Sequence, residues 1–219
     1  MKFYPSRKQT FRMNKRNYQS ELDKIIEGLE DNPPSLLLHT CCAPCSSYCI
    51  EYLAEYFNIT VLYYNPNIFP ESEYIHRKNE QIRLIGEMKT KHPVSFTPCD
   101  FESEKFYETV KGLEECREGG ERCFKCYRLR LEKSAQIAKE NGFDYFTTSL
   151  TISPLKNAAK INEIGEELAK EYGVKFLPSD FKKREGYKRS IELSREYNLY
   201  RQNYCGCVFS QRNSLYTKE

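Results

Sequence analysis

Short apolar segments alternate with longer amphipathic segments along this 219-residue chain. The short segments have the length and composition of buried strands and span 35–40, 59–64, 94–98, 144–148 and 174–178. The amphipathic segments have helical spacing and span 18–30, 44–57, 73–89, 104–115, 126–141, 156–172 and 186–197. This alternation predicts an α/β, doubly wound, mainly parallel five-stranded sheet of Rossmann-like type, with a helical C-terminal extension.

We expect a single domain with three parts: a basic N-terminal arm and helix (1–34), an α/β metal-binding core (35–181) and a helical basic extension (182–219) that completes the active site. The first twenty residues carry six basic side chains and no acid. Residues 182–201 carry seven basic residues against three acidic ones, interleaved with tyrosines. Such segments either form a solvated, ion-paired surface or bind the phosphates and unstacked bases of RNA.

The chain contains ten cysteines, an unusual number for its length. No apolar run is long enough to cross a bilayer, and the start of the chain has no pattern of a secretory signal, so we expect a cytoplasmic protein. In a reducing compartment, clustered cysteines indicate metal ligands or redox groups rather than structural disulfides.

Seven cysteines fall at predicted strand ends or flexible turns: Cys41, Cys42, Cys45, Cys123, Cys126, Cys205 and Cys207. Ligands of open parallel sheets gather at the carboxyl ends of the strands, where Cys41 follows the first strand and Asp100 follows the third. The other three cysteines, Cys49, Cys99 and Cys116, are expected to be structural.

Seven thiols exceed the four that a structural zinc site needs. Four of them, Cys42, Cys45, Cys123 and Cys126, make a suitable ligand set for an iron–sulfur cluster, although ligation by three cysteines is also open. The remaining Cys41, Cys205 and Cys207 either hold a second metal with Asp100 or cycle as redox thiols.

Glycine-rich phosphate loops are absent from the sequence, and the first strand-to-helix turn carries cysteines instead. This argues against a dinucleotide site and against ATP-driven adenylation. Of the three histidines, His39 is expected in the core, and His76 and His92 on the surface.

Four motifs, in this order, resemble the QueH-type epoxyqueuosine reductase family: Leu36–Cys45, Asn65–Ile68, Arg122–Arg130 and Tyr200–Cys207. The resemblance covers about residues 35–210 and implies an adenine nucleotide alpha hydrolase-like fold. It implies an iron–sulfur protein, distinct from the cobalamin-dependent enzyme of the same activity. We expect a [4Fe-4S] cluster and a second metal ion, iron, next to it. The implied reaction is the last step of queuosine biosynthesis, reduction of epoxyqueuosine at the wobble position of tRNAs with GUN anticodons, using an external electron donor.

Reduction of an epoxide to an alkene consumes two electrons and two protons and releases water. On this interpretation Cys41, Cys205, Cys207 and Asp100 hold the metal that binds the epoxide oxygen, and the catalytic residues are Asp100, Tyr127, Cys205 and Cys207. Asp100 is alternatively the proton donor, with Tyr127 as its competitor. Two other functions stay open: an iron–sulfur-dependent tRNA sulfur-transfer enzyme and a zinc-stabilised RNA-binding module without enzymatic activity.

Overall fold

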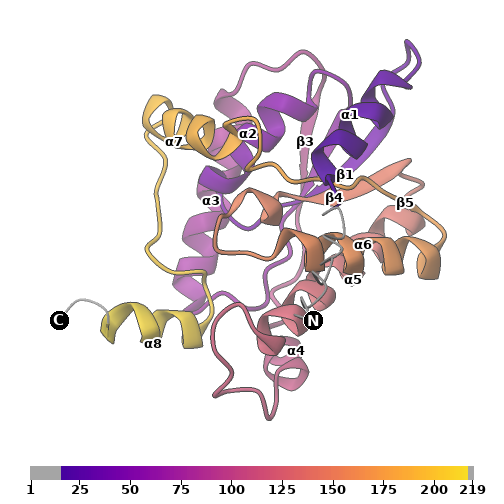
Figure 1. The fold of residues 1–219 in the computed structure, drawn as a ribbon. Helices are drawn as coiled ribbons and strands as arrows, with labels where there is room; N and C mark the ends of the chain where they lie inside the picture. The colour runs from indigo at the N-terminus through magenta and orange to yellow at the C-terminus, as the bar shows by residue number, and fades with distance from the viewer. Residues whose placement is uncertain (1–15, 217–219) are drawn as a thin grey trace, which may run out of the picture.

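The computed structural model describes residues 16–216, which form a five-stranded sheet with helices on both faces (Figure 1). The strands are β1 (Ser35–His39), β2 (Asn58–Leu62), β3 (Val94–Thr97), β4 (Tyr145–Thr148) and β5 (Lys175–Phe176). The helices are α1 (Tyr18–Glu27), α2 (Ala43–Leu53), α3 (Glu71–Glu87), α4 (Ser103–Thr109), α5 (Glu121–Glu140), α6 (Ala158–Tyr172), α7 (Gly186–Glu196) and α8 (Val208–Tyr216). A short 3-10 helix, η1 (Ser149–Ile152), follows β4.

The sheet is entirely parallel, with the strand order β3-β2-β1-β4-β5. At its centre, Leu37 of β1 is paired with Thr60 of β2 on one side and with Phe146 of β4 on the other. The chain builds the sheet outward from β1 to β3 and then crosses to the other side of β1, so the order reverses between β1 and β4. The prediction of a doubly wound parallel sheet is confirmed.

Strand β1 is buried on both faces, as its run of leucines predicts. Leu36 and Leu38 point into the core formed with α1 and α2, whereas Leu37 points to the opposite core with Leu131 of α5 and Ile161 of α6. These three leucines, Leu131 and Ile161 are all completely buried. Figure 1 agrees, with α2 and the pair α5 and α6 on opposite sides of the sheet. No helix within residues 16–216 has the length and apolar character needed to span a membrane.

The start of α5 differs from the sequence-based expectation. A turn was expected around Cys123 and Cys126, with a helix beginning at 126, but α5 begins at Glu121 and carries both cysteines in its first two turns. The turn lies earlier, where Gly119 has a φ of +81° and Gly120 caps the helix. Periodicity did not predict this first turn because its inward-facing positions are occupied by thiols rather than by large apolar side chains. The C-terminal helix α8 was also not predicted.

The segment between α7 and α8 is held along α3. The backbone N–H of Tyr200 donates to Glu80 Oε1 (2.8 Å), and the Tyr204 hydroxyl donates to the carbonyl oxygen of Phe69 (2.6 Å). These contacts bring residues 205–207 to the turn that precedes α3, in the same part of the molecule as the carboxyl ends of β1 and β2.

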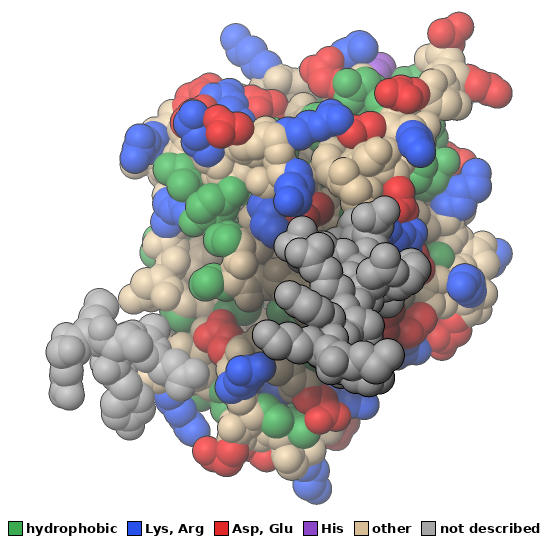
Figure 2. Space-filling model, in the orientation of Figure 1, with side chains coloured by type: hydrophobic (Ala, Val, Ile, Leu, Met, Phe, Trp, Pro, Cys, Tyr) green, Lys and Arg blue, Asp and Glu red, His purple; other side chains and the backbone are tan. Residues whose placement is uncertain are grey.

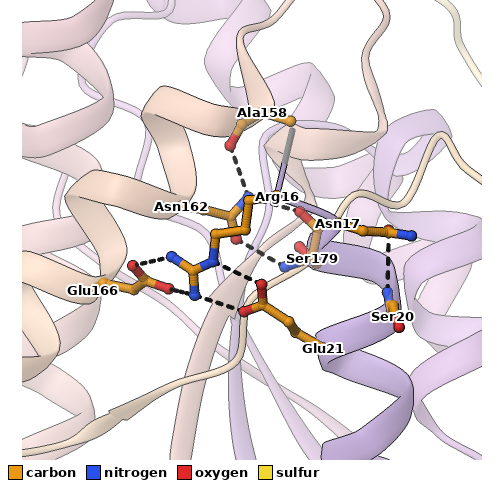
Figure 3. A network of polar contacts seen from close by, with 8 residues as sticks. All are labelled: Arg16, Asn17, Ser20, Glu21, Ala158, Asn162, Glu166 and Ser179. Carbon is orange, nitrogen blue, oxygen red and sulfur yellow. Dashed lines mark hydrogen bonds and ion pairs between the residues drawn. The ribbon is translucent and has the colours of Figure 1, made fainter. Parts of the chain in front are cut away.

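Arg16 fixes the start of α1 against α6 (Figure 3). Its guanidinium donates to both oxygens of Glu21 (2.6 and 2.7 Å) and to both oxygens of Glu166 (2.6 and 2.8 Å). Asn17 caps the helix by accepting from the N–H of Ser20 (3.3 Å). Arg16 is therefore ion-paired, and the other basic residues of the N-terminal arm lie outside the described part of the chain.

Four basic residues of the C-terminal extension are ion-paired. Figure 2 shows Lys and Arg side chains interspersed with Asp and Glu over the face that it draws. The pairs in and around the extension are Lys182–Asp180, Arg184–Asp23, Lys188–Glu185 and Arg189–Glu51. Within residues 16–216, Lys183, Arg195, Arg201 and Arg212 make no ion pair, so these are the cations of the extension most readily available to an RNA phosphate.

Packing of α6 on β5 requires a glycine at position 165. A Cβ atom there would lie 2.4 Å from Cζ of Phe176, whereas one at Gly86, on the exposed face of α3, would meet no atom within 4 Å. We expect Gly165→Ala to lower the free energy of unfolding by about 1–3 kcal/mol through overpacking. Gly86→Ala, the matched control, should raise it by up to about 1 kcal/mol. Urea denaturation measures both, and a wild-type midpoint for Gly165→Ala would contradict this packing.

Candidate metal centre

The first group of cysteines, Cys41, Cys42 and Cys45, lies where the chain passes from β1 into α2. Cys42 caps α2, Pro44 occupies its first turn, and the sulfurs of Cys41, Cys42 and Cys45 all lie within 4.8 Å of one another. The Sγ atoms of Cys41 and Cys42 are 3.9 Å apart. Free N–H groups and the helix dipole at this end favour thiolates, the form that binds metals. These three residues could hold a metal ion or an iron–sulfur cluster.

The second group, Cys123 and Cys126, is three residues apart on α5 and therefore on one helix face. The N–H of Gly119 donates to Cys123 Sγ (3.2 Å). Cys126 is buried, and burial raises the pKa of its thiol to about 12. A metal that binds Cys126 must therefore displace its proton.

The third group, Cys205 and Cys207, flanks Gly206. Gly206 has a φ of +133°, and a Cβ atom there would lie 3.1 Å from the side chain of Ile68 and 3.3 Å from Nη1 of Arg77. Its carbonyl oxygen accepts from the N–H of Phe69 (2.8 Å). Glycine is thus required both by the backbone conformation and by the close approach to the turn before α3.

The three groups line two neighbouring cavities. A cavity of about 370 Å³ is lined by Cys41, Cys45, Cys123 and Cys205. A smaller cavity of about 20 Å³ adjoins Cys123, Cys126, Cys205 and Cys207. Cys42 is in contact with Cys41 beside the larger cavity. Six of the seven cysteines that the sequence singled out therefore line one or the other cavity, and Cys42 contacts one of the six.

The thiols of the first group shift one another's pKa values. Hydrogen bonds from Cys42 and Cys45 hold the pKa of Cys41 well below its usual value, and the same arrangement raises the pKa of Cys45. Gln202 adds a donor from the C-terminal segment, with its Nε2 3.0 Å from Cys42 Sγ. The group thus stabilises a negative charge on sulfur before any metal binds.

Cations surround the cysteines. Lys156, which follows η1, lines the larger cavity. Burial lowers the pKa of its ammonium group, but the negative charges of Cys205, Cys41 and Cys45 outweigh this effect, so the pKa is raised overall. Arg77 and Arg130 are each about 1% exposed. Arg130 Nη1 lies 4.0 Å from Cys126 Sγ, and Arg77 Nη1 donates to the carbonyl oxygen of Cys205 (3.3 Å).

The other candidate residues lie in different environments. Tyr127 is buried and lines both cavities. Asp100 is exposed and lines neither, since it follows β3 at the edge of the sheet, away from the reversal between β1 and β4.

Three residues expected to be structural can be compared with the fold. His39 is in the core, between Thr148 Oγ1 (2.9 Å) and the carbonyl oxygen of Tyr64 (3.0 Å), and burial lowers its pKa to about 3. Cys49 is completely buried in α2, and its thiol donates to the carbonyl oxygen of Cys45 (3.4 Å). Cys116, in the loop before α5, lines neither cavity.

Sequence reasoning missed Lys156, Gln202 and the two buried arginines. For Arg130 a signal existed, because it comes four residues after Cys126 and must share its helix face. Lys156 could have been noted as a cation shortly after the fourth strand, at the carboxyl edge. No local pattern marks Gln202, which depends on the path of the segment along α3.

Together, the fold and the site define an α/β protein that gathers cysteines from three chain segments at the carboxyl edge of a parallel sheet. A family model described as "Epoxyqueuosine reductase QueH" matches residues 36–213 of this chain. The chain belongs to the QueH family.

The chain is similar in sequence to curated relatives over most of their length. The chain is 47% identical over 200 residues to the epoxyqueuosine reductase QueH of Staphylococcus epidermidis, covering 89% of this chain and 84% of the relative. It is 45% identical over 204 residues to that of Streptococcus pyogenes (90% and 80% covered). It is 38% identical over 181 residues to that of Thermotoga maritima (80% and 90% covered).

Two cysteines on α2 provide a matched test of metal binding. We expect Cys45→Ser, which removes one sulfur of the close trio, to lower the iron bound per chain severalfold after anaerobic purification. Cys49→Ser, one turn further along the same helix, should retain the wild-type iron content because its thiol only bonds the backbone. Colorimetric iron and sulfide analysis measures both, and equal iron in the two variants would contradict the site.

Proposed function

We propose that this protein is an epoxyqueuosine reductase that acts on tRNA. It removes the epoxide oxygen of epoxyqueuosine at the anticodon wobble position and so completes queuosine biosynthesis. Its family membership supports this activity. The observation that carries the proposal is the gathering of cysteines from three chain segments around a cavity of about 370 Å³ and the small cavity beside it, since such a set suits a redox-active metal centre beside a small substrate group.

The donor set fits iron. The cysteines are soft thiolate ligands, which favour iron–sulfur clusters, and buried cations lie next to them to offset their negative charge. We propose a [4Fe-4S] cluster with a second iron beside it. When bound, such a centre supplies single electrons and a Lewis acid for the epoxide oxygen.

How the cysteines divide between the two centres is a separate proposal. The sequence-based division assigns Cys42, Cys45, Cys123 and Cys126 to the cluster and leaves Cys41, Cys205 and Cys207 with Asp100 for the second iron. The mutual approach of the sulfurs within 4.8 Å supports a variant in which Cys41 stays with Cys42 and Cys45 on one centre. In this variant the second centre is bound by the other four cysteines, Cys123, Cys126, Cys205 and Cys207.

The protein's own residues supply the protons. In the overall reaction the two carbon–oxygen bonds of the epoxide break, an alkene forms, and the oxygen leaves as water after taking up two electrons and two protons. Tyr127 lines the cavity, and burial raises the pKa of its phenol, which therefore holds its proton. Lys156 is a second protonated group on the same wall.

The substrate base must leave the anticodon stack to reach this cavity. Bases of a single-stranded loop are splayed out at low cost, so a tRNA anticodon suits a recessed site. Lys183 and Arg195 carry charges that are not used by ion pairs within the described chain and could hold the phosphate backbone. Electrons come from an external donor in the reducing cytoplasm.

The activity is tested by anaerobic incubation of the full-length, iron-loaded protein with tRNA that contains epoxyqueuosine and with dithionite as the reductant. Nucleoside mass spectrometry should show conversion of epoxyqueuosine to queuosine, and none without dithionite. An intact cluster with no queuosine would contradict the proposal, and a thiolated nucleoside would indicate sulfur transfer instead.

Loss of the Tyr127 hydroxyl tests its assignment as a proton donor. We expect Tyr127→Phe to lower the rate of queuosine formation by about 100-fold or more while leaving the iron content unchanged. The matched control is Tyr172→Phe, whose hydroxyl bonds Glu132 on the outer face of α5 and α6. A wild-type rate for Tyr127→Phe would remove this residue from the mechanism.

Asp100→Asn separates the two functions proposed for Asp100. Loss of the second iron identifies the carboxylate as a ligand, whereas retained iron with lost turnover identifies it as the acid. Iron analysis and the turnover assay on the same preparation give the answer. Wild-type values in both would exclude Asp100 from the site and agree with its exposed position at the edge of the sheet.

A further inference from the structure

Arg130 is a buried cation with no carboxylate to balance it. It lies on α5, one turn after Cys126, and is about 1% exposed. Its Nη2 donates to Asn65 Oδ1 (2.7 Å), its Nη1 faces Cys126 Sγ (4.0 Å), and its Nε has no hydrogen-bond partner. Within residues 16–216, no Asp or Glu hydrogen-bonds or ion-pairs with this guanidinium.

Burying such a group without an anion is costly. A guanidinium cannot shed its proton in a protein, so it cannot escape the cost of desolvation by becoming neutral. One neutral amide oxygen does not offset the loss of hydration of a full charge. An anion must therefore lie within reach. Glu118 lines the same small cavity as Arg130 but accepts from Ser210, so the anionic group in direct contact with Arg130 is the thiolate of Cys126.

Further thiolates act on Arg130 through their charge. Burial alone would lower the pKa of the guanidinium, but the negative charges of Cys126, Cys41 and Cys205 raise it. Arg130 also lines the small cavity together with cysteines of the second and third groups, so it lies beside several of the candidate ligands rather than one.

Arg77 provides a contrast. It is equally buried, but Glu73 accepts from its Nε at 2.7 Å, and its Nη1 bonds the carbonyl oxygen of Cys205. The charge of Arg77 is therefore largely balanced by its own carboxylate, whereas the charge of Arg130 is not.

We propose that Arg130 is a positioning residue that provides the buried countercharge of the cysteine-bound metal centre and raises its reduction potential. The inference rests on the proposed iron centre but not on the identity of the substrate. A thiolate-ligated cluster gains negative charge when it is reduced. A fixed positive charge in a medium of low dielectric constant stabilises the reduced state more than the oxidised one.

The test compares three variants of the full-length protein, purified without oxygen and studied without tRNA. Arg130→Gln removes the charge, Arg130→Lys keeps it, and Lys125→Gln removes an exposed charge from the same helix between Cys123 and Cys126. Iron per chain and the midpoint potential, from a redox titration followed by absorption and electron paramagnetic resonance, are measured for each.

We expect Arg130→Gln to shift the reduction equilibrium toward the oxidised state by about tenfold or more, which is a fall of about 59 mV for one electron. Arg130→Lys and Lys125→Gln should stay close to the wild-type potential, since the first keeps the charge and solvent screens the second. Loss of iron from Arg130→Gln but not from Arg130→Lys would also support the proposal.

Three results would overturn the inference: a wild-type potential in Arg130→Gln, equal potentials in the Gln and Lys variants, or loss of iron or of folding in both. The third would mean that the shape of the guanidinium matters rather than its charge. Absence of iron from the wild-type protein would instead contradict the proposed cofactor, so the two failures are distinguishable.

Discussion

The pairing of β1 with β2 on one side and β4 on the other is the constraint on which the site depends. Because every strand is parallel, all five carboxyl ends lie at one edge of the sheet. The chain adds β2 and β3 on one side of β1 and β4 and β5 on the other, so the strand order reverses beside β1. The turn after β1 is therefore at the centre of that edge, and the turn is Cys41-Cys42. A pair of cysteines after β3 would lie at the rim of the sheet and would have far fewer neighbours.

Two further segments must reach this central turn. Helix α5 does so because it covers the face of β1 that Leu37 occupies, with its first turns extending past the edge of the sheet. Residues 205–207 do so because the chain is held along α3 as far as the turn at Phe69. The collected thiols then lie beside buried cations on the packed helices: Arg130 on α5, which has no carboxylate partner, and Arg77 on α3, which is paired with Glu73. The charge balance of the site thus follows from the packing of the helices.

Much of this could be predicted from the sequence. The leucine run of β1, the helical spacing of the flanking segments and the cysteine positions fix the sheet class and the edge at which ligands gather. What could not be predicted depends on contacts between distant segments. Gln202 reaches Cys42 only because of the path of the C-terminal segment, and the early start of α5 is not visible because its inward side chains are thiols. Asp100 was placed on the same edge correctly, but strand order, which the sequence does not encode locally, puts it at the rim.

The central claim is that cysteines from all three segments together hold the proposed cluster and the second iron side by side, near the carboxyl end of β1. The most direct measurement is anomalous diffraction at the iron edge from crystals of the protein purified without oxygen. We predict iron density in contact with sulfurs of the groups at 41–45, 123–126 and 205–207 together. Zinc alone, or iron bound by only one of these groups while the protein still reduces epoxyqueuosine, would contradict this account.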